Sequence, residues 1–317
     1  MKSRNQILKW LALLFVIVFS TMGAEAQTGP YPDATPIQIV CITGVTEPYG
    51  VIPTSGSTYV WTVDGVTTSP NWNLSATNTN LATVLWNTAG VYRVQIRETT
   101  PQNCTQPLPI EVVVTVSPLP TATIGGGVPV CQNGTAPVIT FTATGGTAPY
   151  IFTYNVNGGP AQTVTSTGNT ATVIAPVTAF GTFAYNLVSV TDASGTACLN
   201  PQTGSTTVTV NELPTATIGG STELCQNAPP TDITFTGTGG TAPYIFTYNV
   251  NGGPAQTVTT TTGNSVTVSV ATTAAGVFAY NLVSVADASG TICSQAQTGT
   301  ATVTVTPLPV TSPIYHN

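Results

Sequence analysis

The chain has 317 residues, of which 41% are hydrophobic and only 5% are charged, and its formal net charge is −6. Globular chains ordinarily carry roughly 25% charged residues, so Thr, Ser, Asn and Gln must cover most of this surface. Phosphate contacts require Lys and Arg, and this composition therefore excludes a nucleic-acid-binding protein.

The first 26 residues are predicted to be a secretory signal peptide. A basic start leads into an apolar stretch from Trp10 to Phe19, and Ala24-Glu25-Ala26 before Gln27 forms an A-x-A cleavage site. A membrane anchor is the alternative, but the stretch is shorter than the roughly 20 residues that span a bilayer. We expect a secreted or cell-surface protein, with the periplasm as a further option, and no membrane span after cleavage.

The remaining chain is an internal repeat. Residues 147–165, TAPYIFTYNVNGGPAQTVT, recur unchanged at residues 241–259, and the preceding region is a diverged third copy. Each copy runs from an early Cys, through an aromatic strand and a Gly-x-aromatic strand, to a late Cys and a Val/Thr strand that closes on Leu-Pro. The predicted domains are residues 27–118, 119–212 and 213–309, followed by a tail at 310–317.

Strand patterns dominate each copy. Apolar and polar residues alternate in Tyr92–Arg97, and Asn-Gly-Gly turns at 157–159 and 251–253 separate strand candidates at hairpin spacing. The alternative of disorder disagrees with these recurrent β-branched and aromatic residues. The sequence predicts an all-β protein of three tandem immunoglobulin-like antiparallel β-sandwich domains. Short proline-containing joints such as Ser117–Pro120 favour an end-to-end rod.

Six cysteines allow 15 pairings, and the repeat reduces them to two symmetric schemes. Pairing within each copy uses all six, and we favour it: Cys41–Cys104, Cys131–Cys198 and Cys225–Cys293. The rival scheme joins Cys104 to Cys131 and Cys198 to Cys225, and leaves two cysteines unpaired. A metal site is the other alternative, but there is no C-x-x-C motif. Export into an oxidising compartment agrees with disulfides.

Catalytic groups are scarce. His316, close to the C-terminus, is the one histidine of the sequence, so a Ser or Cys nucleophile has no orienting imidazole in the predicted domains. The acids are scattered without the paired spacing that glycoside hydrolysis requires. We predict that the chain is not an enzyme and has no cofactor.

Three weaker binding sites are candidates. Asp192 and Asp287 precede the late cysteines in Asp-Ala-Ser-Gly segments, where a carboxylate could contribute to a calcium site, although such a turn needs no ion. Arg93 and Arg97 share one face of a predicted strand and could hold an anionic glycan, the alternative being solvated surface charges. Trp72 lies outside the strand pattern and could stack on a sugar or pack within a loop. Two further tryptophans, Trp61 and Trp86, fit strand patterns and are predicted to be core.

The first copy resembles a PKD-like domain (polycystic-kidney-disease type, an immunoglobulin-like sandwich). The resemblance rests on residues 59–65, YVWTVDG, and 84–94, VLWNTAGVYRV. The later copies, with residues 145–150 (GGTAPY) and 190–195 (VTDASG), are similar to repeats in large surface adhesins of gliding bacteria that use type IX secretion. This resemblance implies surface display and binding to a matrix or glycans.

Taken together, these patterns predict an exported, non-catalytic structural or adhesive cell-surface protein whose partner is an unknown surface glycan or protein. One alternative is a carbohydrate-binding accessory protein. Another is a self-assembling fibre subunit, in which residues 310–315 pair with an exposed sheet edge of the next copy.

Overall fold

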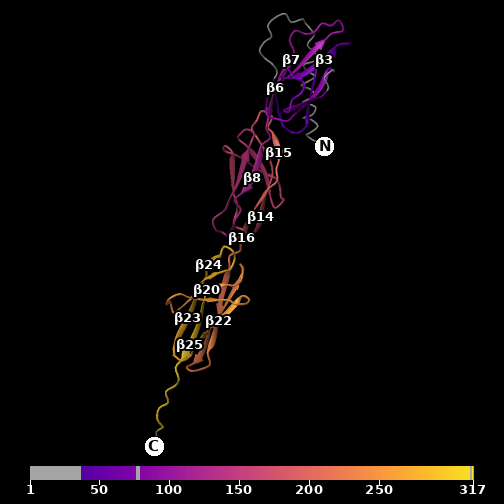
Figure 1. The fold of residues 1–317 in the computed structure, drawn as a ribbon. Coiled ribbons are helices and arrows are strands. Elements are labelled where there is room, and N and C mark those ends of the chain that lie inside the picture. The colour runs from indigo at the N-terminus through magenta and orange to yellow at the C-terminus, as the bar shows by residue number, and fades with distance from the viewer. Residues whose placement is uncertain (1–36, 76–78, 315, 317) are drawn as a thin grey trace, which may run out of the picture. The chain divides into compact units, whose positions relative to one another are not determined.

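The computed structural model describes residues 37–75, 79–314 and 316 (Figure 1), so the predicted signal peptide lies outside the described residues. Every regular secondary-structure element in this part of the chain is a β-strand, which confirms the all-β prediction. No helix in the described ranges is long and apolar enough to cross a membrane. The fold divides into two compact units. The first comprises the described residues up to Thr121 with Thr144–Tyr150 and Thr191–Asn200, and the second comprises the rest.

The first repeat forms a sandwich of a four-stranded sheet, β1-β7-β6-β3, and a three-stranded sheet, β2-β5-β4. Its strands are β1 (Ile37–Cys41), β2 (Thr46–Gly50), β3 (Thr58–Val63), β4 (Trp72–Ser75), β5 (Leu81–Trp86), β6 (Gly90–Thr99) and β7 (Ile110–Ser117). Strand β6 shows why the sheets pack together. Tyr92, Val94 and Ile96 are buried, while the side chains between them face outward.

The second and third repeats each form a three-stranded and a six-stranded sheet. The second contains β8 (Thr121–Gly125), β9 (Pro129–Cys131), β10 (Val138–Thr144), β11 (Ile151–Val156), β12 (Gln162–Thr165), β13 (Thr170–Ile174), β14 (Gly181–Thr191), β15 (Leu199–Pro201) and β16 (Ser205–Asn211). The third contains β17 (Thr215–Gly219), β18 (Thr222–Cys225), β19 (Thr231–Thr238), β20 (Ile245–Val250), β21 (Gln256–Thr259), β22 (Ser265–Val270), β23 (Gly276–Ala286), β24 (Ser294–Ala296) and β25 (Thr300–Thr306).

Aromatic side chains fill the cores between the paired sheets. In the second repeat the Phe141 and Phe152 rings lie 5.5 Å apart, and in the third Phe235 and Phe246 lie 5.7 Å apart. All four side chains are fully buried. Two mainly antiparallel sheets that face each other across such a core make each repeat an immunoglobulin-like β-sandwich.

The predicted Asn-Gly hairpins are confirmed. Asn157 and Gly158 both have positive φ, 51° and 70°, and the Gly159 N–H donates to the Val156 carbonyl at 2.9 Å. Positive φ at both central residues is the type I′ geometry that matches the right-handed twist of paired strands. This turn connects β11 to β12, and the equivalent turn at Asn251 connects β20 to β21.

A short parallel strand carries the early cysteine of each repeat. Strands β1, β9 and β18 lie parallel to the closing strands β7, β16 and β25, and the register places Cys41, Cys131 and Cys225 opposite Ser117, Asn211 and Thr306. Each partner is the final residue of its closing strand. The early cysteine therefore marks the exit end of the sandwich, the end where the closing strand leaves it.

Candidate functional site

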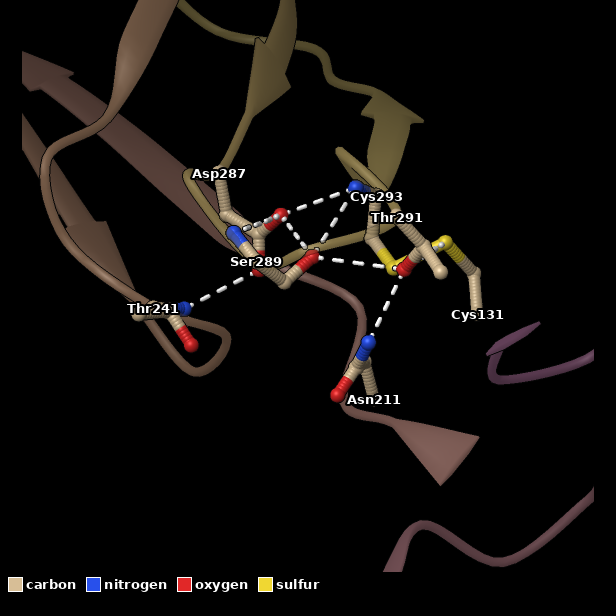
Figure 2. The surroundings of a disulfide bond; sticks show 7 residues. All are labelled: Cys131, Asn211, Thr241, Asp287, Ser289, Thr291 and Cys293. Carbon is tan, nitrogen blue, oxygen red and sulfur yellow. Dashed lines mark hydrogen bonds between the residues drawn. A yellow bond between two sulfur atoms is a disulfide. The ribbon is translucent and has the colours of Figure 1, made fainter. Parts of the chain in front are cut away.

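The late cysteine of the third repeat follows a turn organised by a buried aspartate (Figure 2). Asp287 is 2% exposed, and its Oδ1 accepts hydrogen bonds from Ser289 N, Ser289 Oγ and Cys293 N at 3.2, 2.7 and 2.8 Å. Its Oδ2 accepts the Thr241 N–H at 3.0 Å. This carboxylate thus satisfies backbone donors that the turn would otherwise leave buried and unpaired.

The second repeat builds the same turn. Asp192 Oδ1 accepts from Ser194 N, Ser194 Oγ and Cys198 N at 3.2, 2.6 and 2.8 Å, and Oδ2 accepts from Thr147 N at 2.9 Å. Gly146 has φ +67°, and a Cβ there would lie 2.6 Å from Asp192 Oδ2, so this close approach requires glycine.

These hydrogen bonds bear on the calcium hypothesis. Each hydrogen-bond partner found for the Asp192 and Asp287 carboxylates is a donor, whereas a calcium ion needs further oxygen ligands around it. In the described ranges no group of three or more His, Cys, Asp or Glu side chains could hold a metal ion. The geometry assigns both aspartates a role in the turn, and calcium binding stays a hypothesis for experiment.

A tyrosine lies beside the third-repeat turn. Burial, followed by the charges of Asp287 and Glu212, raises the pKa of the Tyr244 phenol. The Tyr244 hydroxyl donates to the Gly239 carbonyl at 2.6 Å.

The disulfides join successive repeats, so the predicted pairing within repeats is wrong. Cys41 is bonded to Cys198 and Cys131 to Cys293, with Cα atoms 5.7 and 5.5 Å apart. The early cysteine of one repeat is thus linked to the late cysteine of the next. Cys104 and Cys225 are unbonded and exposed, which also contradicts the rival scheme.

Strand direction explains why pairing within a repeat fails. In the first sandwich β6 runs antiparallel to β7, so Cys104, which follows β6, lies near the start of β7, at the entry end. Cys41 lies beside Ser117 at the other end of β7. The eight residues of β7 separate the two ends by about 23 Å at roughly 3.3 Å per residue, far beyond the 4.4–6.8 Å that disulfide Cα atoms allow.

A threonine two positions before each bonded late cysteine contacts the early one. Thr291 Oγ1 lies 3.4 Å from Cys131 Sγ and accepts a 2.9 Å hydrogen bond from Asn211 Nδ2 (Figure 2). Thr196 Oγ1 lies 3.1 Å from Cys41 Sγ. Sequence reasoning missed these residues, although both threonines stand at the same offset from a repeated cysteine.

The predicted arginine face exists on the outer side of the four-stranded sheet. Arg93 Nη1 forms a 3.1 Å ion pair with Glu111, and Gln95 Nε2 donates to the same carboxylate at 2.9 Å. Arg97 Nη1 donates a longer hydrogen bond, 3.4 Å, to the Gln106 carbonyl. Gln95 and Arg97 line a shallow hollow with Val60, Thr62, Gly65 and Pro109.

Trp72 does not lie on the surface, so its predicted glycan contact is wrong. It begins β4, is 2% exposed, and packs in the core of the first sandwich. The register of β4 with β5 sets Trp72 opposite Trp86, and both indoles are buried. The core prediction for Trp61 and Trp86 is confirmed, at 3% and 2% exposure.

Comparison with known proteins gives a likeness of fold only. No family model matches the chain, and no curated protein matches it. Among solved structures, a chain from a study of a 1.5-MDa bacterial ice-binding adhesin is 18% identical with a TM-score of 0.36, and the match covers 86% of this chain and 95% of that solved chain. The mouse nectin-like molecule 4 ectodomain (Ig1–Ig3) is 12% identical with a TM-score of 0.41, covering 88% and 100%. The SGBP-B protein of a Bacteroides ovatus mixed-linkage glucan utilization locus is 16% identical with a TM-score of 0.23, covering 90% and 72%.

Proposed function

We propose that the chain is an exported, non-catalytic structural protein of the cell surface, built to resist extension between its two ends. Its surface location is supported by the disulfides, which persist in oxidising compartments, and by the resemblance of the repeats to surface adhesins. The non-catalytic part of the proposal rests on a sequence with one histidine, located at position 316, and scattered acids.

The observation that carries this proposal is the overlap of the two disulfide loops. Cys41–Cys198 closes a loop of 157 positions and Cys131–Cys293 one of 162, and both loops contain the segment from Cys131 to Cys198. The shortest covalent path from Cys41 to Cys293 crosses one disulfide, follows this segment of 67 positions, and crosses the other disulfide. Reduction lengthens the path to 252 positions.

The difference is large at the scale of a pulling experiment. At about 3.5 Å per extended residue, the oxidised path reaches about 230 Å and the reduced path about 880 Å. Even if tension unfolded every sandwich, the disulfides would limit the distance between Cys41 and Cys293 to about 230 Å. We expect a surface stalk under shear to gain from such a limit.

Single-molecule force spectroscopy tests the proposal. The exported chain, held at both ends, should reach a contour length about 650 Å greater after reduction than before it. Equal contour lengths before and after reduction would contradict the proposal.

A single variant distinguishes overlapping disulfide loops from disulfide loops closed within each repeat. Cys131→Ser leaves a path from Cys198 to Cys293 of 95 positions, so it should add 28 positions, about 100 Å, to the oxidised length. Separate loops within each repeat would add about 230 Å instead, the length of the 67 positions from Cys131 to Cys198.

A second candidate, the binding of an anionic glycan or protein, is favoured by Arg97. Its guanidinium makes one long hydrogen bond at the edge of the hollow, whereas Arg93 is held by Glu111. Binding to an array of sulfated and carboxylated glycans should fall at least tenfold in Arg97→Gln and change little in Arg93→Gln. Equal losses in the two variants, or no binding by the parent chain, would reject this candidate.

A further inference from the structure

The two unbonded cysteines stand where the other repeats carry disulfide partners. Cys225 is the early cysteine of the third repeat, and Cys104 is the late cysteine of the first. The same chain bonds the equivalent pairs, Cys41 to Cys198 and Cys131 to Cys293. One chain thus carries one unbonded early cysteine and one unbonded late cysteine.

The surroundings of Cys225 match those of the bonded early cysteines. Cys225 lies opposite Thr306 at the end of β25, as Cys131 lies opposite Asn211 at the end of β16. The residue after each early cysteine donates its N–H to the carbonyl of that final strand residue: Ile42 to Ser117 at 3.1 Å, Gln132 to Asn211 at 2.8 Å and Gln226 to Thr306 at 2.8 Å. The backbone around Cys225 therefore has the arrangement that surrounds Cys41 and Cys131, the early cysteines that form disulfides between repeats.

The backbone next to Cys104 matches the backbone next to the bonded late cysteines. The residue before the cysteine has positive φ in all three repeats: 60° at Asn103, 51° at Ala197 and 51° at Ile292. The N–H of each donates to a carbonyl three residues earlier, at 2.8–2.9 Å. The carbonyl of each late cysteine accepts an N–H from Thr100, Asp192 or Asp287 at 2.9–3.1 Å. The same positive φ and the same two kinds of backbone hydrogen bond thus recur beside all three thiols.

The Cys104 turn differs from the turns of the bonded late cysteines in its length, in the side chains that hold it and in the exposure of its thiol. Thr100 stands in place of the aspartate, and its Oγ1 accepts the Cys104 N–H at 3.3 Å. The turn before Cys104 is two residues shorter than the turn from Asp192 to Cys198, and Gln102 stands where Thr196 contacts the early cysteine. Cys104 Sγ lies 4.0 Å from the Gln102 carbonyl oxygen and is exposed, whereas Cys198 is buried beside its partner.

From this correspondence we propose that copies of this chain join head to tail through a disulfide between Cys225 of one copy and Cys104 of the next. This disulfide between copies would pair an early cysteine with a late one, as both disulfides within the chain do. The two thiols lose two protons and two electrons to form one S–S bond, and a small disulfide oxidant such as oxidised glutathione is reduced to two thiols. The inference deepens the proposed structural function, because covalent linkage extends the resistance to tension from one copy to many.

Complementary single variants test the proposal. Cys104→Ser and Cys225→Ser each keep one half of the joint, and neither changes the two existing disulfides. In a glutathione redox buffer, the parent chain should give a series of reducible oligomers on a non-reducing gel. An equimolar mixture of the two variants should give a dimer and nothing larger, at least tenfold more than either variant alone.

Peptide mapping identifies the bond. A chymotryptic digest of the dimer should contain one Cys104–Cys225 crosslink along with the Cys41–Cys198 and Cys131–Cys293 crosslinks. A parent chain that stays monomeric with both internal crosslinks intact would overturn the inference and leave the proposed function standing. Either variant alone dimerising as well as the mixture would also overturn it, since the bond would then join like halves.

Discussion

At the scale of single residues, the aspartate before each bonded late cysteine is a structural acceptor. Asp287 receives three backbone N–H groups and one hydroxyl, and almost none of its surface meets solvent. A hydrogen bond to a charged group contributes about 1.5–3 kcal/mol, and a buried donor left unpaired costs about 1–3 kcal/mol.

Asp287→Ala should therefore lower the free energy of unfolding of the third sandwich by about 3 kcal/mol, because its donors lose their acceptor. Urea unfolding followed by tyrosine fluorescence measures this change. Asp232→Ala is the matched control, since Asp232 is an exposed side chain in β19 and should cost less than about 0.5 kcal/mol. Equal effects in the two variants would show that the turn does not depend on Asp287.

The same hydrogen bonds lead to a prediction about calcium. Because donors surround both carboxylates, we expect the melting temperature to be the same in millimolar calcium and in excess EDTA. Differential scanning calorimetry of the oxidised protein measures this difference. A rise of several degrees in calcium that is absent from Asp192→Asn would revive the calcium hypothesis.

At the scale of strands, β4 ties the three-stranded sheet of the first sandwich to its core. Trp72 is buried at the start of this strand, opposite Trp86. Replacing a buried Trp by Ala typically costs about 3–5 kcal/mol through lost burial and the cavity left behind.

Trp72→Ala should accordingly destabilise the first sandwich by about 3–5 kcal/mol and leave any glycan retention by the folded protein unchanged. Urea unfolding gives the first quantity, and affinity electrophoresis in polysaccharide gels gives the second. Val91→Ala serves as the control, because Val91 is 66% exposed. Loss of retention without loss of stability would restore Trp72 as a sugar contact.

The sequence predicts long, regular strands better than short ones. The alternation of Tyr92–Arg97 identifies both faces of β6, and the structure buries Tyr92, Val94 and Ile96 as expected. Strand β4 has only four residues, so alternation cannot assign its inward face, and pairing with β5 decides it. A long-range contact thus determines the position of Trp72, and local pattern does not contain that information.

At the scale of the whole molecule, the disulfide pattern follows from strand direction. Repeat symmetry correctly reduces the cysteines to two equivalent sets, early and late. It does not show that the short strand ending at each early cysteine pairs in parallel with the closing strand. That pairing places Cys41 and Cys104 at opposite ends of one sandwich, and the topology of the fold was needed to find it.

Thiol counting tests this pairing across the chain. Alkylation of the native protein should modify Cys104 and Cys225 alone, and alkylation after reduction in denaturant should modify all six cysteines. Intact mass spectrometry gives the number of labels, and peptide mapping gives their positions. A native monomer that takes up no label would instead support pairing within each repeat.

The overlap of the two loops also determines what becomes of a chain that is cut. A single backbone break at any position between Cys41 and Cys293 leaves at least one disulfide across the break. Between Cys131 and Cys198, two disulfides span it. A protease could therefore cut the backbone of one sandwich without releasing the residues on the far side of the cut. That sandwich could unfold, while the disulfides would keep the two fragments covalently joined.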